Sequence, residues 1–372
     1  MLRAAEPLLD GGSGDAVANV LLRTAGAGVT AFALGMVIGP IVVRTLKRFR
    51  TQDIVEKTDS QKLAELSKGK RDTPTMGGVM FLPPLALAVA VFGNLQNQYV
   101  TNALLGTVGF CLIGAFDDVL KLTRRGRSGI SGRGKFALQC GVSVALAISL
   151  VVTMKARATG ADLKQLLSLT VPFTSASLDL SWAGGWPFVA CAAAIMVATS
   201  NAVNLTDGLD GLALGCVIFA AAAFVGISYA VGRPDYAGHF SIHYVRGAQE
   251  MAIVAAALAG TALAFLWFNA FPARVFLGDT GSLALGGLLG YIAIVAKQEL
   301  VLSIVGGVFV AEALSVILQV ASFKSTGRRI FRCAPLHHHF QFGGMHEVTI
   351  VVRFWICAAL CALCGLATLK FG

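Results

Sequence analysis

Two adjacent acids, Asp117 and Asp118, directly follow an apolar run that ends at Phe116, and Lys121 comes one helical turn later. Neighbouring carboxylates repel each other unless a cation or a proton relieves them, and charges at the edge of a membrane span are costly. A charged helix end in water is the alternative interpretation. Because carboxylates are also the ligands that Mg²⁺ prefers, we treat the pair as candidate catalytic residues.

A second polar block, residues 204–210, joins two apolar runs with almost no spacer. Asp207 and Asp210 are three residues apart, so they would share one face if the segment were helical. Asp207 could instead cap the next helix, but capping would not explain Asn204 and Asp210 as well. Gly208 would let a ligand approach the backbone closely, so the block is a candidate binding segment.

A third motif, residues 276–282, lies just ahead of another apolar run. Its Gly, Asp, Thr and Ser residues stand at an expected helix start, which offers free N–H groups and a favourable dipole for an anion. Asp279 adds a hard oxygen ligand for a cation. Capping of the helix by Asp279 or Thr280 is the alternative.

Three consecutive histidines, residues 337–339, follow Pro335 within the chain. They cannot all point the same way, and a zinc site normally has wider ligand spacing. Hydrogen-bond donors to a phosphate or a sugar fit the triplet better. A solvated loop is the alternative.

A basic pair, Lys70 and Arg71, precedes a Pro-Thr-Met-Gly-Gly segment at residues 74–78. Either side chain could pair with a phosphate, and the two glycines would allow close backbone approach. The alternative is a positively charged anchor at the membrane surface.

Ten apolar runs position these motifs. They cover about residues 20–43, 76–92, 100–116, 136–153, 186–203, 208–230, 251–268, 281–296, 300–320 and 350–369. Runs of about this length are typical of membrane-spanning helices. The composition agrees, because only 13% of residues are charged, against about 25% in soluble domains. We predict an all-α integral membrane protein with ten transmembrane helices and a single catalytic domain over residues 1–372.

The distribution of Lys and Arg predicts the topology. Twenty of the 30 lie in the connections after the odd-numbered runs, and six lie in the other connections. Because positively charged loops stay cytoplasmic, both termini, including the tail 1–19, are predicted on the periplasmic or outer side. All five motifs then lie at the cytoplasmic face, where a nucleotide can meet a lipid phosphate. A transporter would place its acids near the bilayer midplane. Topology also accounts for the net charge of +10, so we expect no nucleic-acid binding.

The outer connections carry weaker signals. In residues 154–185, the stretches 166–171 and 177–182 around Pro172 predict a short strand hairpin. In residues 231–250, His239 and His243 could bind a metal, but a structural or solvated role fits better because they lie on the face opposite the other motifs. Seven of the eight cysteines fall in apolar runs, so we expect packing rather than disulfides.

At its motifs the sequence resembles the phospho-N-acetylmuramoyl-pentapeptide transferase (MraY) family of the polyprenyl-phosphate N-acetylhexosamine-1-phosphate transferase superfamily. The resemblance runs from about Arg71 to the C-terminus. The acids at 117–118 and the block 204–210 are superfamily-wide, whereas residues 74–78, 275–283 and 334–340 are more specific. The histidine triplet separates this family from GlcNAc-1-phosphate transferases, which are the alternative. Gln341 departs from the family pattern, where an acid is expected.

The resemblance implies a reaction. Phospho-MurNAc-pentapeptide would move from UDP-MurNAc-pentapeptide to undecaprenyl phosphate, giving lipid I and UMP for peptidoglycan biosynthesis. It also implies Mg²⁺ as the cofactor, ten membrane helices, a homodimer and a location in the bilayer of the bacterial inner membrane.

The same resemblance implies residue roles. Asp279 would bind Mg²⁺, and Asp117 would act as base or nucleophile with Asp118 supporting the same catalytic site. The remaining residues would bind substrate: Lys70, Lys121 and Lys135 the phosphates; Asn204, Asp207 and Asp210 the nucleotide and its phosphates; Phe276 the uracil, with Gly278 in the same motif; Gln319 the sugar-phosphate; and His337, His338 and His339 the donor. Asp117 could deprotonate the lipid phosphate or form a covalent intermediate, and the sequence leaves both open.

Overall fold

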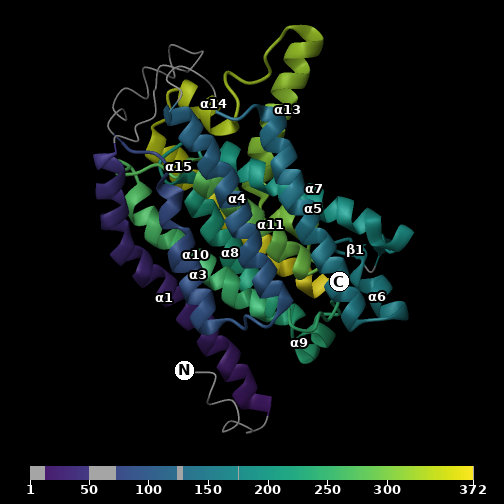
Figure 1. The fold of residues 1–372 in the computed structure, drawn as a ribbon. Helices are drawn as coiled ribbons and strands as arrows, with labels where there is room; N and C mark the ends of the chain where they lie inside the picture. The colour runs from purple at the N-terminus through teal and green to yellow at the C-terminus, as the bar shows by residue number, and fades with distance from the viewer. Residues whose placement is uncertain (1–12, 50–72, 124–128, 175, 372) are drawn as a thin grey trace.

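The computed structural model describes residues 13–49, 73–123, 129–174 and 176–371, and it is predominantly helical (Figure 1). Within these residues, nine helices are long and apolar enough to cross a membrane. They are α1 (Ser13–Arg48), α4 (Gln98–Thr123), α5 (Gly132–Arg157), α7 (Trp186–Thr206), α8 (Leu212–Val231), α10 (Glu250–Asn269), α11 (Gly278–Val295), α13 (Gly307–Thr326) and α15 (Glu347–Ala367). The prediction of an all-α membrane protein is confirmed at this level.

The run predicted at residues 76–92 is shorter than a full span. It begins as the 3-10 helix η4 (Gly77–Met80) and continues as α3 (Leu82–Phe92). Pro83 and Pro84 follow Leu82 in the first turn of α3, a position that tolerates proline because the first N–H groups of a helix have no intrahelical partner. The tenth transmembrane helix therefore stays a prediction.

Helix α11 forms the centre of the bundle, because nearly all of its residues are buried. It packs against α4, α7 and α8, and small residues permit these contacts. A Cβ atom at Gly286 would collide with the backbone of Thr199 and Ser200 on α7, and one at Gly287 would collide with the ring of Phe110 on α4. Glycine at these positions lets the backbones of α11 and its neighbours approach each other closely.

The run predicted at residues 300–320 is interrupted at Gly306, which separates the short helix α12 (Val301–Val305) from α13. Figure 1 shows α13 projecting beyond the rest of the bundle at the end that also carries α14 (Leu336–Phe342). Several large apolar side chains of α13 are exposed, including Leu314, Ile317 and Leu318. This face of α13 is therefore suited to contact lipid.

The opposite end of the bundle carries short elements: α6 (Gly160–Leu166), β1 (Ser168–Thr170), β2 (Ser177–Asp179), η5 (Ala183–Gly185) and α9 (Pro234–His239). The predicted hairpin is confirmed, since β1 and β2 pair antiparallel with Leu169 opposite Leu178. His243 contacts Gln165, whereas His239 packs edge-on against Phe240. These contacts agree with a structural role for this histidine pair. All eight cysteines are free, as expected.

Candidate active site

Asp279, in the first turn of α11, is the centre of a polar cluster. Its Oδ2 atom accepts hydrogen bonds from Lys121 Nζ on α4 at 2.6 Å and from Lys135 Nζ on α5 at 2.7 Å. Its Oδ1 atom accepts one from Asn204 Nδ2, near the end of α7, at 2.6 Å. Four separate helices therefore supply the groups that meet at this carboxylate.

Asp117 joins the same cluster from α4. Its Oδ2 atom lies 2.9 Å from Lys121 Nζ and 3.5 Å from Lys135 Nζ, so both lysines bridge Asp117 and Asp279. Its Oδ1 atom accepts the backbone N–H of Ile130 at 2.6 Å, and this bond fixes the carboxylate beside the entry to α5. Asp117 is buried, so its negative charge depends on these partners.

Asp118 has a different environment from its neighbour. Its carboxylate accepts the backbone N–H groups of Asp279 at 3.3 Å and Thr280 at 2.9 Å, and the hydroxyl of Thr280 at 2.6 Å. These are orphan donors at the N-terminus of α11, so Asp118 caps that helix from α4. Gly278 has φ +70°, and a Cβ there would lie 2.8 Å from Asp118 Oδ2. Gly278 is therefore needed for Asp118 to reach the helix start.

The segment 74–78 positions the residues just before α11. Phe276 N donates to Pro74 O at 2.8 Å, Gly77 N donates to Phe276 O at 2.8 Å, and Gly78 N donates to Leu277 O at 2.9 Å. These bonds fix the backbone of Phe276, whose side chain is half-buried. Its stacking on uracil stays a prediction, and Lys70 lies outside the described residues.

The block 204–210 is not a continuous helix. Helix α7 ends at Thr206 and α8 begins at Leu212, so Asp207 and Asp210 lie in the turn between them. The expectation of one shared helix face is wrong. Asp210 is buried and accepts the backbone N–H of Ala273 at 3.0 Å, so it orients the connection before α11.

The carboxyl group of Asp207 interacts electrostatically with the acids of this cluster. Loss of water around this carboxyl group, followed by the charges of Asp279 and Asp118, raises its pKa well above the usual range. No hydrogen bond or ion pair to a described residue holds its side chain. Asp207 is therefore the acid of the cluster that would gain most from a bound cation.

The histidine triplet is anchored by Glu312, a fully buried acid on α13. Its carboxylate accepts the backbone N–H groups of Leu336 at 2.7 Å and His337 at 3.1 Å, and it lies 3.1 Å from His337 Nδ1. The other ring nitrogen of His337 is buried without a hydrogen bond to a described residue. It packs directly against Gly208, so His337 reaches the candidate binding segment 204–210.

The other two histidines point in different directions. His338 Nδ1 lies 2.9 Å from Gln341 Oε1, and His339 Nδ1 accepts the backbone N–H of Arg332 at 3.1 Å. Gln319 holds the preceding loop, since its amide bonds to the backbone of Ile330 and Phe331. A sugar-phosphate contact of Gln319 stays a prediction.

Sequence reasoning missed Glu312 and Thr280 as parts of this region. Glu312 had a readable signal, because it is a lone acid inside the apolar run 300–320, and such a charge needs a partner. The sequence indicates Thr280 only as a possible cap of its own helix. Its contact with Asp118 depends on the packing of α4 against α11, which the local sequence does not show.

The cluster fits a divalent cation. Asp117, Asp118 and Asp279 each offer an oxygen, and these three oxygens lie within 4.8 Å of one another. Asp207 adds a fourth carboxylate, whereas Lys121 and Lys135 supply the only two cations among the described contacts of these acids. Carboxylates are in excess, and hard oxygen donors in this number suit Mg²⁺ with substrate phosphate oxygens.

Two family comparisons agree with this site. The model of glycosyl transferase family 4 matches residues 100–297, more than half of the chain, and this range includes Asp117, Asn204 and Asp279. Signature 1 of phospho-N-acetylmuramoyl-pentapeptide-transferase matches residues 70–82, which include the segment that pairs with Phe276 and Leu277. The chain therefore belongs to glycosyl transferase family 4 and, within it, to the phospho-N-acetylmuramoyl-pentapeptide transferase family.

Proposed function

We propose that this membrane transferase moves phospho-MurNAc-pentapeptide from UDP-MurNAc-pentapeptide to undecaprenyl phosphate, releasing UMP and forming lipid I. The observation that carries the proposal is the excess-carboxylate cluster around Asp279, bridged by Lys121 and Lys135, in a chain that bears the family signature. Both substrates are phosphate esters, so the same ammonium groups can bind either one.

In the proposed reaction, the ammonium groups of Lys121 and Lys135 release a carboxylate oxygen and bind phosphate oxygens of the substrates instead. This would align the lipid phosphate with the β-phosphorus of the donor, so that a new P–O bond forms as the bond to UMP breaks. Asp279, with Asp117 and Asp207 nearby, would hold Mg²⁺, which supplies charge stabilisation to the phosphates when it is bound.

Asp117 is the proposed base or nucleophile. Its Oδ1 atom is already held by Ile130 N, so Oδ2, which lies beside both lysines, is the oxygen that can act. It would either take the proton of the lipid phosphate, or attack the β-phosphorus, expel UMP and form an acyl phosphate; the lipid phosphate would then attack that phosphorus and release Asp117. Asp118 would position the start of α11 through its three hydrogen bonds.

We assign donor selection to the histidine triplet, residues 337–339, at the start of α14. The buried nitrogen of His337 beside Gly208 has no partner among the described residues, so it is available to a polar group of the donor. We infer that His338 and His339 contact the sugar or peptide, Phe276 the uracil, and Asn204 the donor phosphates.

The cellular setting is proposed on the same basis. The chain would act as one catalytic domain and a homodimer in the bacterial inner membrane. The acidic cluster would then lie at the cytoplasmic face and both termini at the outer face, as the Lys and Arg distribution predicts.

The test is UMP release by purified full-length protein in detergent with undecaprenyl phosphate and Mg²⁺. UDP-MurNAc-pentapeptide and UDP-GlcNAc are supplied in parallel, and EDTA is the metal control. We expect Mg²⁺-dependent release with the muramyl donor only. Release with UDP-GlcNAc only would move the protein to the GlcNAc-1-phosphate transferases, and no release from folded protein would contradict the proposal.

A further inference from the structure

Among the described side chains, few basic ones lie in the connections, or in the last turn of α5, at the end of the bundle opposite Asp279. They are Lys155, Arg157, Lys164, Arg233, Arg246 and Lys297. Three of them are neutralised by acids, in the pairs Lys164–Asp179 at 3.1 Å, Arg233–Asp235 at 3.0 Å and Lys297–Glu299 at 2.6 Å. Lys155 donates to the carbonyl of Gly184. Arg157 and Arg246 are left without a carboxylate partner among the described residues.

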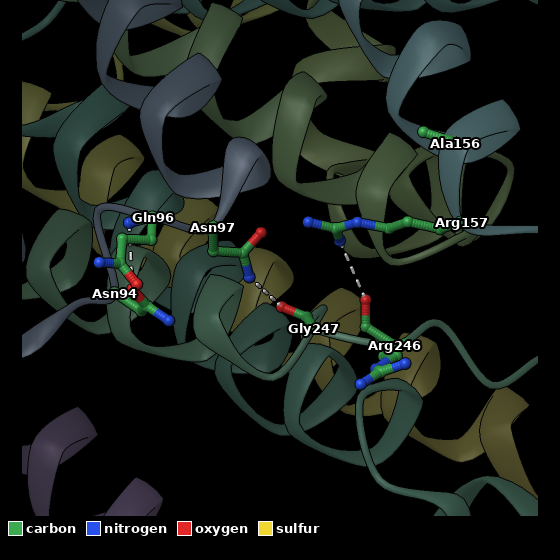
Figure 2. Close-up of a pocket in the computed structure, with 7 residues that line it drawn as sticks. All are labelled: Asn94, Gln96, Asn97, Ala156, Arg157, Arg246 and Gly247. Atoms are coloured by element: carbon green, nitrogen blue, oxygen red, sulfur yellow. Dashed lines mark hydrogen bonds between the residues drawn. The ribbon is translucent and has the colours of Figure 1, made fainter.

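These two arginines line the same pocket, of about 470 Å³ (Figure 2). Its lining consists of Asn94, Gln96, Asn97, Ala156, Arg157, Arg246 and Gly247. The guanidinium of Arg157 lies 4.8 Å from the ring centroid of Tyr99, and its Nη1 donates to Arg246 O at 3.4 Å. Arg157 is therefore held in place at the pocket by contacts that leave its charge uncompensated.

The remaining lining is rich in donors. Asn97 is buried. Its Nδ2 atom donates to Gly247 O at 2.8 Å and its Oδ1 atom accepts from Tyr99 N at 3.1 Å, so both ends of its amide are held at the pocket wall. The side-chain nitrogens of Asn94 and Gln96 donate no hydrogen bond to a described residue. Two guanidinium groups and two amide nitrogens without acceptors favour an anion in this pocket.

Glu250, the acid that bonds to this wall within the described residues, already pairs with an arginine. Glu250 Oε2 accepts the backbone N–H of Asn94 at 2.7 Å, but the same oxygen lies 2.9 Å from Arg23 Nη2. Glu250 is buried, so it does not present its charge to the pocket surface. The anion must therefore come from outside the described chain.

The position of the pocket indicates which anion is available there. Asn97 directly precedes α4, and Asp117 lies 20 residues further along, about 30 Å at 1.5 Å per residue, which is the thickness of a bilayer core. Exposed aromatic side chains gather at the pocket's end of the bundle: Trp182, Trp186, Tyr236 and Tyr244. Tryptophan and tyrosine collect at the headgroup level of membranes, so we place the pocket at the level of the phosphates of the opposite leaflet.

We propose that this pocket binds the phosphate group of an anionic phospholipid in the leaflet opposite the catalytic cluster. Arg157 and Arg246 hold the phosphate oxygens, and the amides of Asn94 and Gln96 donate to the oxygens of the headgroup. The bound lipid ties together three connections of the chain, namely those before α4, after α5 and before α10.

The test is native mass spectrometry of the full-length protein with phosphatidylglycerol or phosphatidylcholine of the same acyl chains. We expect the wild-type protein to retain phosphatidylglycerol preferentially. In R157Q/R246Q, binding should weaken by about tenfold or more, because two charged donors are lost. The double variant K155Q/K164Q removes the same charge from the same end and should keep the preference.

Two results would overturn the proposal. One is equal phosphatidylglycerol retention by the wild-type protein and R157Q/R246Q. The other is saturation of the pocket by inorganic phosphate alone, without any phosphatidylglycerol preference, which would identify a free anion rather than a lipid. If the double variant fails to fold, R246Q carries the test, since no described hydrogen bond uses the exposed Arg246 side chain.

Discussion

The two ends of α11 carry two different arrangements of acids and lysines. At its start, Asp279 meets Lys121 and Lys135, and the side chain of Lys121 is 37% exposed. Just beyond its end, Lys297 and Glu299 form a closed pair at 2.6 Å, with each side chain 1% exposed. The first group has more carboxylates than cations and its lysines are partly exposed, whereas the second has one acid and one lysine and is fully buried.

This difference separates a binding arrangement from a structural one. A balanced, desolvated pair has no charge left for a ligand, and Lys297 also lies 4.6 Å from the ring centroid of Phe188. An acid excess with partly exposed lysines can accept both a cation and an anion, as the proposed Mg²⁺–phosphate site would require. Substitutions at the start of α11 should therefore act mainly on activity, and substitutions beyond its end mainly on stability.

The largest effect is expected for Asp279→Asn. The substitution keeps the side-chain shape but removes the charge that would hold the metal, so UMP release should fall about 1000-fold or more. Because the Asp279 carboxylate also accepts hydrogen bonds from Lys121, Lys135 and Asn204, some loss of stability is expected as well, so turnover is compared per folded molecule. Asp179→Asn, at the other end of the bundle, is the control and should retain activity. Wild-type turnover by Asp279→Asn would remove Asp279 from its assigned role.

Lys297→Met should instead destabilise the protein, because it leaves the buried Glu299 carboxylate unpaired. We expect a loss of about 3 kcal/mol in the free energy of unfolding, measured as a lower thermal midpoint in detergent. Activity per folded molecule should be unchanged.

The loss in Lys297→Met should depend on pH. Burial raises the pKa of Glu299 and Lys297 opposes that rise, so the variant has an even higher pKa. Between the ordinary glutamate pKa and this raised value, the folded state binds more protons than the unfolded state, and stability falls as pH rises. The deficit should therefore be smaller at pH 5 than at pH 8. Equal midpoints for variant and wild type at both pH values would contradict this account.

The contrast between the two ends also shows what sequence can predict. Asp117 and Asp279 were identifiable because acids beside apolar runs are rare and need partners. Their convergence with Lys121 followed from the predicted topology. The capping of α11 by Asp118 and the use of Asp210 by Ala273 N were not predictable, since both depend on contacts between distant segments. The break at Gly306 was likewise hidden within one continuous apolar run.

Glu312→Gln tests whether a fully buried acid on α13 supports donor binding by positioning the histidine triplet. The amide keeps one acceptor oxygen but loses the charge that holds Leu336 N, His337 N and His337 Nδ1. We expect kcat/KM for the donor to fall about 10- to 100-fold, mainly through KM, because the histidine triplet on α14 shifts while the Asp279 cluster stays intact. Glu312→Ala, which removes both acceptors, should lose more. A fall confined to kcat, or equal activity in all three proteins, would exclude this positioning role.

The smallest effect is expected for the double variant Lys297→Met with Glu299→Leu. Removing both charges of a buried pair leaves no unpaired group, so the free energy of unfolding should return to within about 1 kcal/mol of the wild-type value, and the thermal midpoint should rise accordingly. The matched double variant at the other end, Asp279→Asn with Lys121→Met, should not recover activity, because an open site needs the charges themselves rather than their balance. We expect stability to recover in the Lys297–Glu299 double variant and activity to stay lost in the Asp279–Lys121 double variant. Recovery of activity in the second variant would show that the Asp279 cluster is only a structural ion pair.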